Sequence, residues 1–328
     1  MEEKDIKIRG VGSVIYNKKK RLDFMRKFVV LAGLVGLVLI YALLGLKTFF
    51  TLRNFLIIIQ QSAALAIVGF GMTFIIMQGG IDLSVGSVVG VAGLASAYTL
   101  HFTSSSILAV LSALSVGLAF GLFNGLIHVK YKIPAFLTTL GTLSIGRGIC
   151  IVWSKGVSMP IYRGSFISKI GSIPHIIILM AVVFIITFII LKYTTFGRYV
   201  QAIGDNEAAA KLVGINVNRV KLYCFIIGSA CAALGGLVLS SRIGAATPRT
   251  GEQWELDVIA AIVLGGTPLT GGIGGVERTL LGVILFIILS NGLILLGISS
   301  DVQLIIKGFV LIVAVGASLD RDRIGTIK

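Results

Sequence analysis

The chain has few charged residues for its length. Only 13% of its 328 residues are charged while 56% are hydrophobic, whereas soluble globular proteins have about 25% charged residues. The mean hydropathy is +0.99, because apolar runs of about 20 residues, the length with which a helix crosses a bilayer, recur along the sequence. This composition excludes a water-soluble fold and predicts an all-α integral membrane protein.

Several kinds of functional site are also missing. The three cysteines, Cys150, Cys224 and Cys231, fall in apolar runs without a CxxC pair, so neither a disulfide framework nor a zinc site is expected. The three histidines have no carboxylate or serine at catalytic spacing, which argues against an enzyme. Because no Gly-Lys pair occurs in the chain, it has no P-loop, and we expect it to bind no cofactor itself.

Ten apolar segments are predicted to span the membrane, with a broken or re-entrant segment near the eighth. They are residues 28–46, 55–77, 83–100, 107–129, 134–153, 175–191, 222–241, 256–271, 279–297 and 302–318. The domain plan is a basic cytoplasmic segment (1–27), one transmembrane permease domain (28–318) and a cytoplasmic tail (319–328).

The distribution of positive charge gives the orientation. With the N-terminus in the cytoplasm, the inner segments hold 20 Lys or Arg residues and the outer segments hold 7. This is the asymmetry of the positive-inside rule, and it predicts that both termini are cytoplasmic. The net charge of +15 therefore indicates contact with the lipid bilayer and membrane orientation, and no nucleic acid partner is expected.

Two glycine-rich stretches, 79–84 and 265–275, bring turns to membrane depth. Irregular backbone there must be buried in protein or line a water-filled cavity. Pro268 lies among the glycines of the second stretch and interrupts any helix, which predicts the break near the eighth span. The spaced glycines elsewhere, such as Gly117, Gly121 and Gly125, favour close helix packing.

One inner loop, residues 192–221, is both long and polar. Asp205 or Asn206 can cap a short helix whose first turn holds Glu207, and Gly214 can end it in the left-handed conformation. A capped, alanine-rich helix outside the membrane fits recognition by a groove of another protein. An ordinary amphipathic connector is the alternative.

Three long motifs carry a family resemblance. They are GMTFIIMQGGIDLSVGS (71–87), FGRYVQAIGDNEAAAKLVGINVNRVK (196–221) and ELDVIAAIVLGGTPLTGGIGG (255–275). With these motifs in order, the chain from about residue 49 resembles the permease subunits of bacterial ABC importers for monosaccharides, the group of the ribose, arabinose, xylose and autoinducer-2 permeases.

The resemblance implies a bacterial inner-membrane assembly. Its expected partners are a second permease subunit (an identical chain or a close paralogue), ABC ATPase subunits that bind ATP and Mg, an extracellular or periplasmic sugar-binding protein, and a monosaccharide. By motif position it implies an ATPase-coupling helix with Gly204, Asn206, Glu207, Ala208, Ala209, Gly214 and Ile215. The sequence departs from the family pattern at Asp205, Trp254, Arg249 and Glu252, and the sugar stays open.

Polar residues in or beside the spans are candidates for the translocation path. They are Asp82 and Ser84 of the GGIDLS motif, Asn124, Asn291, Gln60 and Gln61. A carboxylate at membrane depth usually marks a pathway or a partner, although Asp82 can equally cap the third span. Hydrogen bonding between helices explains the amides equally well.

Charged residues near the predicted outer end of the eighth span are candidates for docking the binding protein. They are Arg249, Glu252 and Glu255, and a solvated loop is the alternative. The rival function is a secondary transporter or channel that works without an ATPase. That rival requires a cluster of acids within the spans, but the acids of this chain are few and peripheral.

Overall fold

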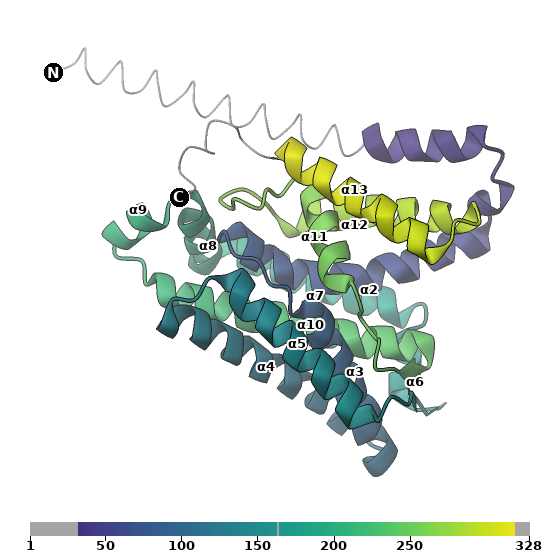
Figure 1. Cartoon of the computed structure of the whole chain (residues 1–328), viewed down its shortest axis with the longest axis horizontal. Helices are drawn as coiled ribbons and strands as arrows, with labels where there is room; N and C mark the ends of the chain where they lie inside the picture. Colours follow the sequence, from purple (N-terminus) through teal and green to yellow (C-terminus); the bar gives the residue numbers. More distant parts are fainter. Residues whose placement is uncertain (1–31, 163, 319–328) are drawn as a thin grey trace.

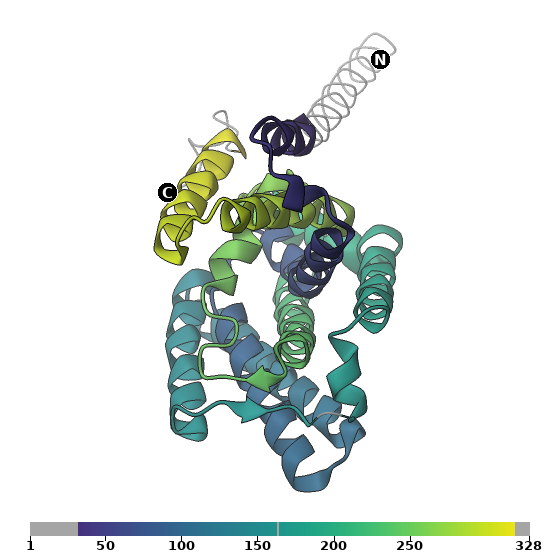
Figure 2. The ribbon, with the colours of Figure 1, turned by 90° about the vertical axis from the view of Figure 1, so that its right-hand side faces the viewer.

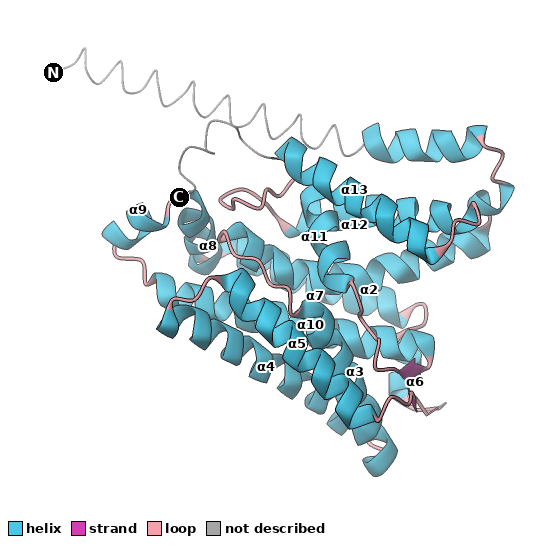
Figure 3. Ribbon diagram, viewed as in Figure 1, coloured by secondary structure: helices cyan, strands magenta, loops and turns pink. Residues whose placement is uncertain are grey.

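The computed structural model describes residues 32–162 and 164–318, and it confirms the helical class (Figures 1 and 3). About 79% of these described residues are helical. The described strands are β1 (Met159–Pro160) and β2 (Ala245–Ala246), each of two residues. They pair antiparallel, with Met159 opposite Ala246.

Seven described helices are long and apolar enough to cross a membrane. They are α2 (Leu52–Met77), α3 (Val85–Thr103), α4 (Ser106–Tyr131), α5 (Ala135–Ser154), α7 (His175–Tyr193), α10 (Val217–Ile243) and α12 (Val276–Leu295). They coincide with predicted spans two to seven and nine. The other elements are η1 (Lys47–Phe50), α6 (Phe166–Ile170), α8 (Thr195–Asp205), α9 (Glu207–Leu212), α11 (Trp254–Leu264) and α13 (Ser300–Ser318).

The remaining predicted spans are not among these seven. In the first, residues 28–31 lie outside the described residues, and Ala32–Leu43 is a short apolar helix. The tenth coincides with α13. The polar segments 1–27 and 319–328 also lie outside the described residues.

The eighth predicted span, 256–271, is wrong as a membrane-crossing helix. α11 has 11 residues, a length of about 16 Å, which is about half of the hydrocarbon core. The chain enters α11 through turns at 248–253 and leaves it through turns from Gly265. A broken element is therefore present as predicted, but half of it lies before the helix, where no break was predicted.

α10 packs against α2, α3 and α4 in the middle of the bundle. Small residues permit the contact with α4. A Cβ atom added at Gly121 would lie 2.7 Å from the Cα of Ile226, and one at Gly117 would lie 2.6 Å from the carbonyl oxygen of Ser229. The glycine spacing therefore serves helix packing, as expected. α2, α3, α10 and α12 are mostly buried, whereas α4, α5 and α7 expose large apolar side chains, as lipid-facing helices do.

The long helices give the bundle two ends (Figure 1). α8 and α9 lie at one, which we call the α9 end. α6 and the β1–β2 pair lie at the other, which we call the α6 end. Figure 2 looks from the α6 end, and the light-green chain that follows β2 runs from there back towards α11.

Candidate functional site

The α9 end carries the short helix predicted in the inner loop. The Asn206 side chain caps α9, because its Oδ1 accepts a hydrogen bond from the Ala209 N–H at 3.0 Å. Gly214 follows with φ of +84°, a conformation that glycine adopts without strain. The cap and the stop of the helix are therefore the predicted ones, with Asn206 rather than Asp205 as the cap.

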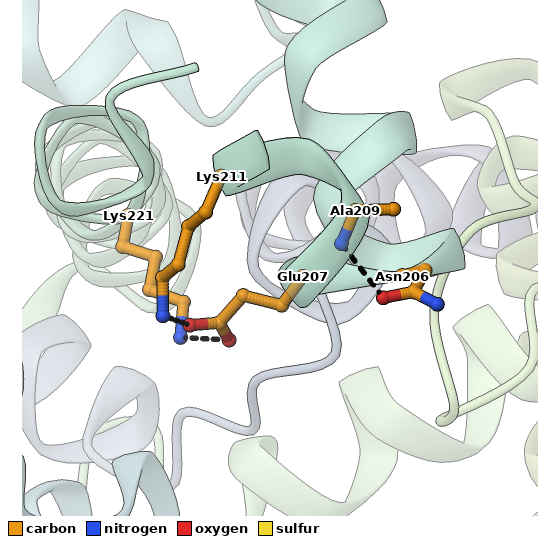
Figure 4. A network of polar contacts seen from close by, with 5 residues as sticks. All are labelled: Asn206, Glu207, Ala209, Lys211 and Lys221. Atoms are coloured by element: carbon orange, nitrogen blue, oxygen red, sulfur yellow. Dashed lines mark hydrogen bonds and ion pairs between the residues drawn. The ribbon is translucent and has the colours of Figure 1, made fainter. Parts of the chain in front are cut away.

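Glu207 joins α9 to the start of α10 (Figure 4). Its Oε2 lies 2.8 Å from Nζ of Lys221 and its Oε1 lies 2.6 Å from Nζ of Lys211. Partial burial raises the pKa of the Glu207 carboxyl, but the hydrogen bonds and positive charges of the two lysines outweigh it, so the pKa lies below its usual value. Glu207 is therefore charged at neutral pH and clamps the helix in place.

The outward face of α9 is small and apolar. Ala208 and Ala209 are exposed, while Ala210 is buried against Val217 and its neighbours in the core. Leu212 is 89% exposed and Val213 is 76% exposed. Apolar side chains outside the spans favour contact with a protein. Sequence reasoning missed Leu212 and Val213, although their place in the last turn of the predicted helix was a usable signal.

Two residues of the predicted coupling set point into the protein. Gly204 belongs to α8, and a Cβ atom there would collide with the Met77 carbonyl and the Gly272 N–H. Ile215 packs against the core cluster that includes Ala210. These two residues position the helix, whereas Ala208, Ala209 and Gly214 are on the surface.

The end of α2 and the glycine-rich stretch 265–275 meet α8 at this end. The Gly272 N–H donates to the Met77 carbonyl at 2.9 Å. A Cβ at Gly272, which has φ of +78°, would collide with the Asp205 carboxylate. The end of α2, the turns after α11 and the α8–α9 hinge are therefore in direct contact. The junction of α8 and α9 is thus packed directly against the ends of the spans.

A cavity of about 280 Å³ lies beside α9. Its lining includes Gln78, His128, Glu207 and Lys221. Gln78 is buried, and its Oε1 has no hydrogen-bond partner among the described residues. The cavity thus connects the first turn of α9 with the turn that follows α2.

Asp82, Ser84 and Asn124 form one buried network with Thr142. Asp82 Oδ1 accepts from the Ser84 N–H at 2.7 Å and from the Ser84 hydroxyl at 2.6 Å. Asn124 Nδ2 donates to Ser84 Oγ at 2.9 Å, and Thr142 donates to Asn124 Oδ1 at 2.6 Å. The network ties the turn before α3 to α4 and α5, and all four side chains are buried.

The other path candidates lie apart from this network. Asn291 of α12 exchanges two hydrogen bonds with Asn54 of α2, at 2.9 and 3.0 Å. This is the interhelical role that the sequence left open. Gln60 and Gln61 lie half-buried along α2.

The docking candidates separate into two groups. Arg249 and Glu252 are exposed and form an ion pair, with Nε 3.7 Å from Oε2. Glu255 lies on the first turn of α11, and its Oε2 is buried near Gly86 without a hydrogen-bond partner among the described residues. Glu255 therefore points into the protein.

Known proteins resemble this chain over most of its length. A family model described as "Branched-chain amino acid transport system / permease component" matches residues 54–315. The chain is 39% identical to a ribose import permease protein of Haemophilus influenzae, over 95% of this chain and 99% of that protein. It is 38% identical to a ribose import permease protein of Bacillus subtilis, over 94% and 98%. An L-arabinose transport system permease protein of Escherichia coli is 36% identical, over 85% and 88%. No solved structure matches the chain.

Proposed function

Since the chain belongs to the family of transport system permease components, we propose that it forms the path through which an ATP-driven importer carries a pentose or a related monosaccharide. The chain is a multi-pass protein of the inner membrane and a permease of the ABC importer class. The proposal concerns its substrate, its active residues and its assembly.

The exposed face of α9 carries the proposal. A helix that is capped by Asn206, clamped by Glu207 and exposed at Ala208 and Ala209 has no role in lipid. It fits a groove on an ATPase subunit, in the manner of helix-in-groove recognition. ATP and Mg would bind to that subunit, and this chain would hydrolyse nothing.

The α9 end is accordingly assigned to the cytoplasm. This orientation agrees with the excess of Lys and Arg in the inner segments. It puts the α6 end on the outer side, where a soluble binding protein would deliver the sugar. Both chain termini would then be cytoplasmic.

The substrate is assigned from the relatives rather than from the family description. The description names branched-chain amino acids, but relatives aligned over nearly the whole chain carry ribose or L-arabinose in their names. A sugar needs hydrogen-bonding groups along its path, since unpaired buried polar groups are costly. A second permease subunit would complete the path between two chains.

Reconstitution tests the function. The chain, its ATPase subunits and its binding protein should together take up ribose or another pentose in liposomes, and each should be required. Sugar uptake by the chain alone, driven by an ion gradient, would contradict the proposal and support a secondary transporter.

A further inference from the structure

The chain between β2 and α11 runs at membrane depth, which the sequence did not predict. The Arg147 side chain on α5 holds it there. Nη1 donates to the Thr250 carbonyl at 2.9 Å and Nη2 donates to the Gly251 carbonyl at 2.6 Å. Thr250 and Gly251 are themselves buried. An arginine inside a span thus satisfies the carbonyls of a non-helical segment.

Positions along α3 and α5 give the depth of this segment below the α6 end. Tyr98 of α3 and Trp153 of α5 lie at the same level near the α6 end, since their rings stack with centroids 5.4 Å apart. Arg147 lies seven residues before the end of α5, or about 10 Å below it. A Cβ at Gly90 would lie 2.9 Å from the Thr250 carbonyl, and Gly90 lies eight residues, or about 12 Å, below Tyr98.

From this point α11 continues towards the α9 end, and an ion pair holds it against α13. Its Asp257 Oδ2 lies 2.9 Å from Nζ of Lys307 on α13, and both side chains are mostly buried. Gly86 and Gly90 on α3 leave room for the backbone of the segment, because a side chain at either would collide with it. The segment is therefore anchored on α3, α5 and, through α11, on α13.

The outward side chains of this segment are polar. Arg249 is 88% exposed and Glu252 is 53% exposed, and Gln253 is also exposed. Charged side chains facing hydrocarbon at this depth are costly. Irregular backbone at membrane depth is tolerated where it is buried or lines a water-filled cavity. These side chains must therefore face water or protein, not lipid.

We propose that the segment 247–253 lines the translocation path, and that Arg249, Glu252 and Gln253 contact the transported polyhydroxylated solute. The carboxylate accepts hydrogen bonds from sugar hydroxyls, and the guanidinium and amide donate to sugar oxygens. Glu255 Oε2 lies at the same level, buried beside Arg147 and without a hydrogen-bond partner in the described part of the chain. This inference rests on the proposed function for the identity of the solute, and it assigns Arg249 and Glu252 to the path instead of to binding-protein docking.

Thiol accessibility tests where the segment lies. Arg249→Cys and Glu252→Cys importers in lipid nanodiscs, which expose both membrane faces, are treated with a small, charged methanethiosulfonate reagent. Val182→Cys is the lipid control, because Val182 is exposed on α7 at a matched depth of about 10 Å from the α6 end. Tyr162→Cys is the surface control, since Tyr162 is 73% exposed beside β1. The wild-type chain, with its buried cysteines, gives the background.

The labelling rate of both variants is expected to lie between the rates of the lipid control and the surface control. It is also expected to depend on the nucleotide state of the importer. Both variants should react about tenfold faster than Val182→Cys, because the reagent stays out of hydrocarbon. Trapping the ATPases with vanadate should change their rates severalfold, as a population shift of the path requires. A rate equal to the lipid control would overturn the proposal. So would a rate equal to Tyr162→Cys in every nucleotide state.

Transport measurements distinguish whether Arg249 and Glu252 contact the sugar in the path or dock the binding protein. Arg249→Met and Glu252→Gln should lower sugar uptake roughly tenfold, because lost substrate contacts raise the barrier to passage. The binding-protein concentration that gives half-maximal ATPase stimulation should stay the same. If that concentration rises and excess binding protein restores uptake, the residues dock the binding protein and the proposal is wrong. If the wild-type importer carries no monosaccharide, the proposed function fails, while the accessibility result still decides whether the segment lines a path.

Discussion

Glu207 and Lys221 are fourteen residues apart in the chain, and their side chains meet with Nζ 2.8 Å from Oε2. The contact fixes the first turn of α9 to the start of α10, the helix that packs against α2, α3 and α4. The contact therefore ties α9 directly to the helix in the middle of the bundle. Lys211 meets the same carboxylate from within α9 and makes no such connection.

Removing the contact between Glu207 and Lys221 should uncouple sugar transport from ATP hydrolysis. Lys221→Met leaves Glu207 and α9 in place but detaches them from α10, so sugar uptake should fall severalfold while the ATPase still docks and hydrolyses ATP. Uptake and phosphate release are measured on the same liposomes. Lys211→Met is the matched control, because this pair is more exposed and such pairs contribute about 0.5 kcal/mol. Equal losses in the two variants would argue against mechanical coupling through Lys221.

The outward face of α9 should tolerate no large charge. Ala209→Arg puts a long cation on the exposed alanine face, so ATPase binding and sugar uptake should be abolished while the chain still inserts into the membrane. Copurification of the ATPase and membrane fractionation measure the two effects. Asn218→Arg, also exposed at this end, should bind and transport normally. Normal uptake by the Ala209→Arg variant would remove α9 from the coupling role.

The ionisation of Glu207 should report its contacts with Lys211 and Lys221. Because the pKa of Glu207 is lowered in the folded protein, its carboxylate stabilises the fold fully above the unfolded pKa of about 4.3. This contribution is lost as the pH falls through the folded pKa. Carboxyl ¹³C NMR should give a midpoint below about 4.3, and Lys221→Met should raise it. A midpoint at or above the ordinary value in the wild-type chain would contradict the observed contacts.

The α4–α10 contact should be sensitive to a single methyl group. Gly121→Ala places a Cβ 2.7 Å from the Cα of Ile226, which should cost about 1–3 kcal/mol through overpacking and lower the melting temperature. Gly141→Ala on α5 meets nothing within 4 Å and should keep or raise it, because alanine favours helix over glycine by about 1 kcal/mol. Equal melting temperatures for the two variants would refute the close packing.

Much of the α9 end could be predicted from the sequence, because its signals are local. The cap at Asn206, the stop at Gly214 and the exposed alanines all lie within nine residues. The partner of Glu207 could not be predicted, since Lys221 is brought to it by the turn between α9 and α10. The pairing of Asn54 with Asn291 depends in the same way on how α2 packs against α12.

The segment before α11 escaped prediction for a different reason. Hydropathy detects apolar length, and the run from 256 onward is apolar whether or not its neighbours are helical. The support for the preceding turns comes from Arg147, about 100 residues away in the chain. A lone arginine in a span was visible in the sequence, but the carbonyls that it satisfies were not.

The most direct test of the account is sugar uptake by the complete importer in liposomes. We predict that uptake of a pentose requires this chain, its ATPase, its binding protein and ATP, and that Ala209→Arg abolishes uptake. Uptake that persists without the ATPase, or that is unaffected by Ala209→Arg, would contradict it.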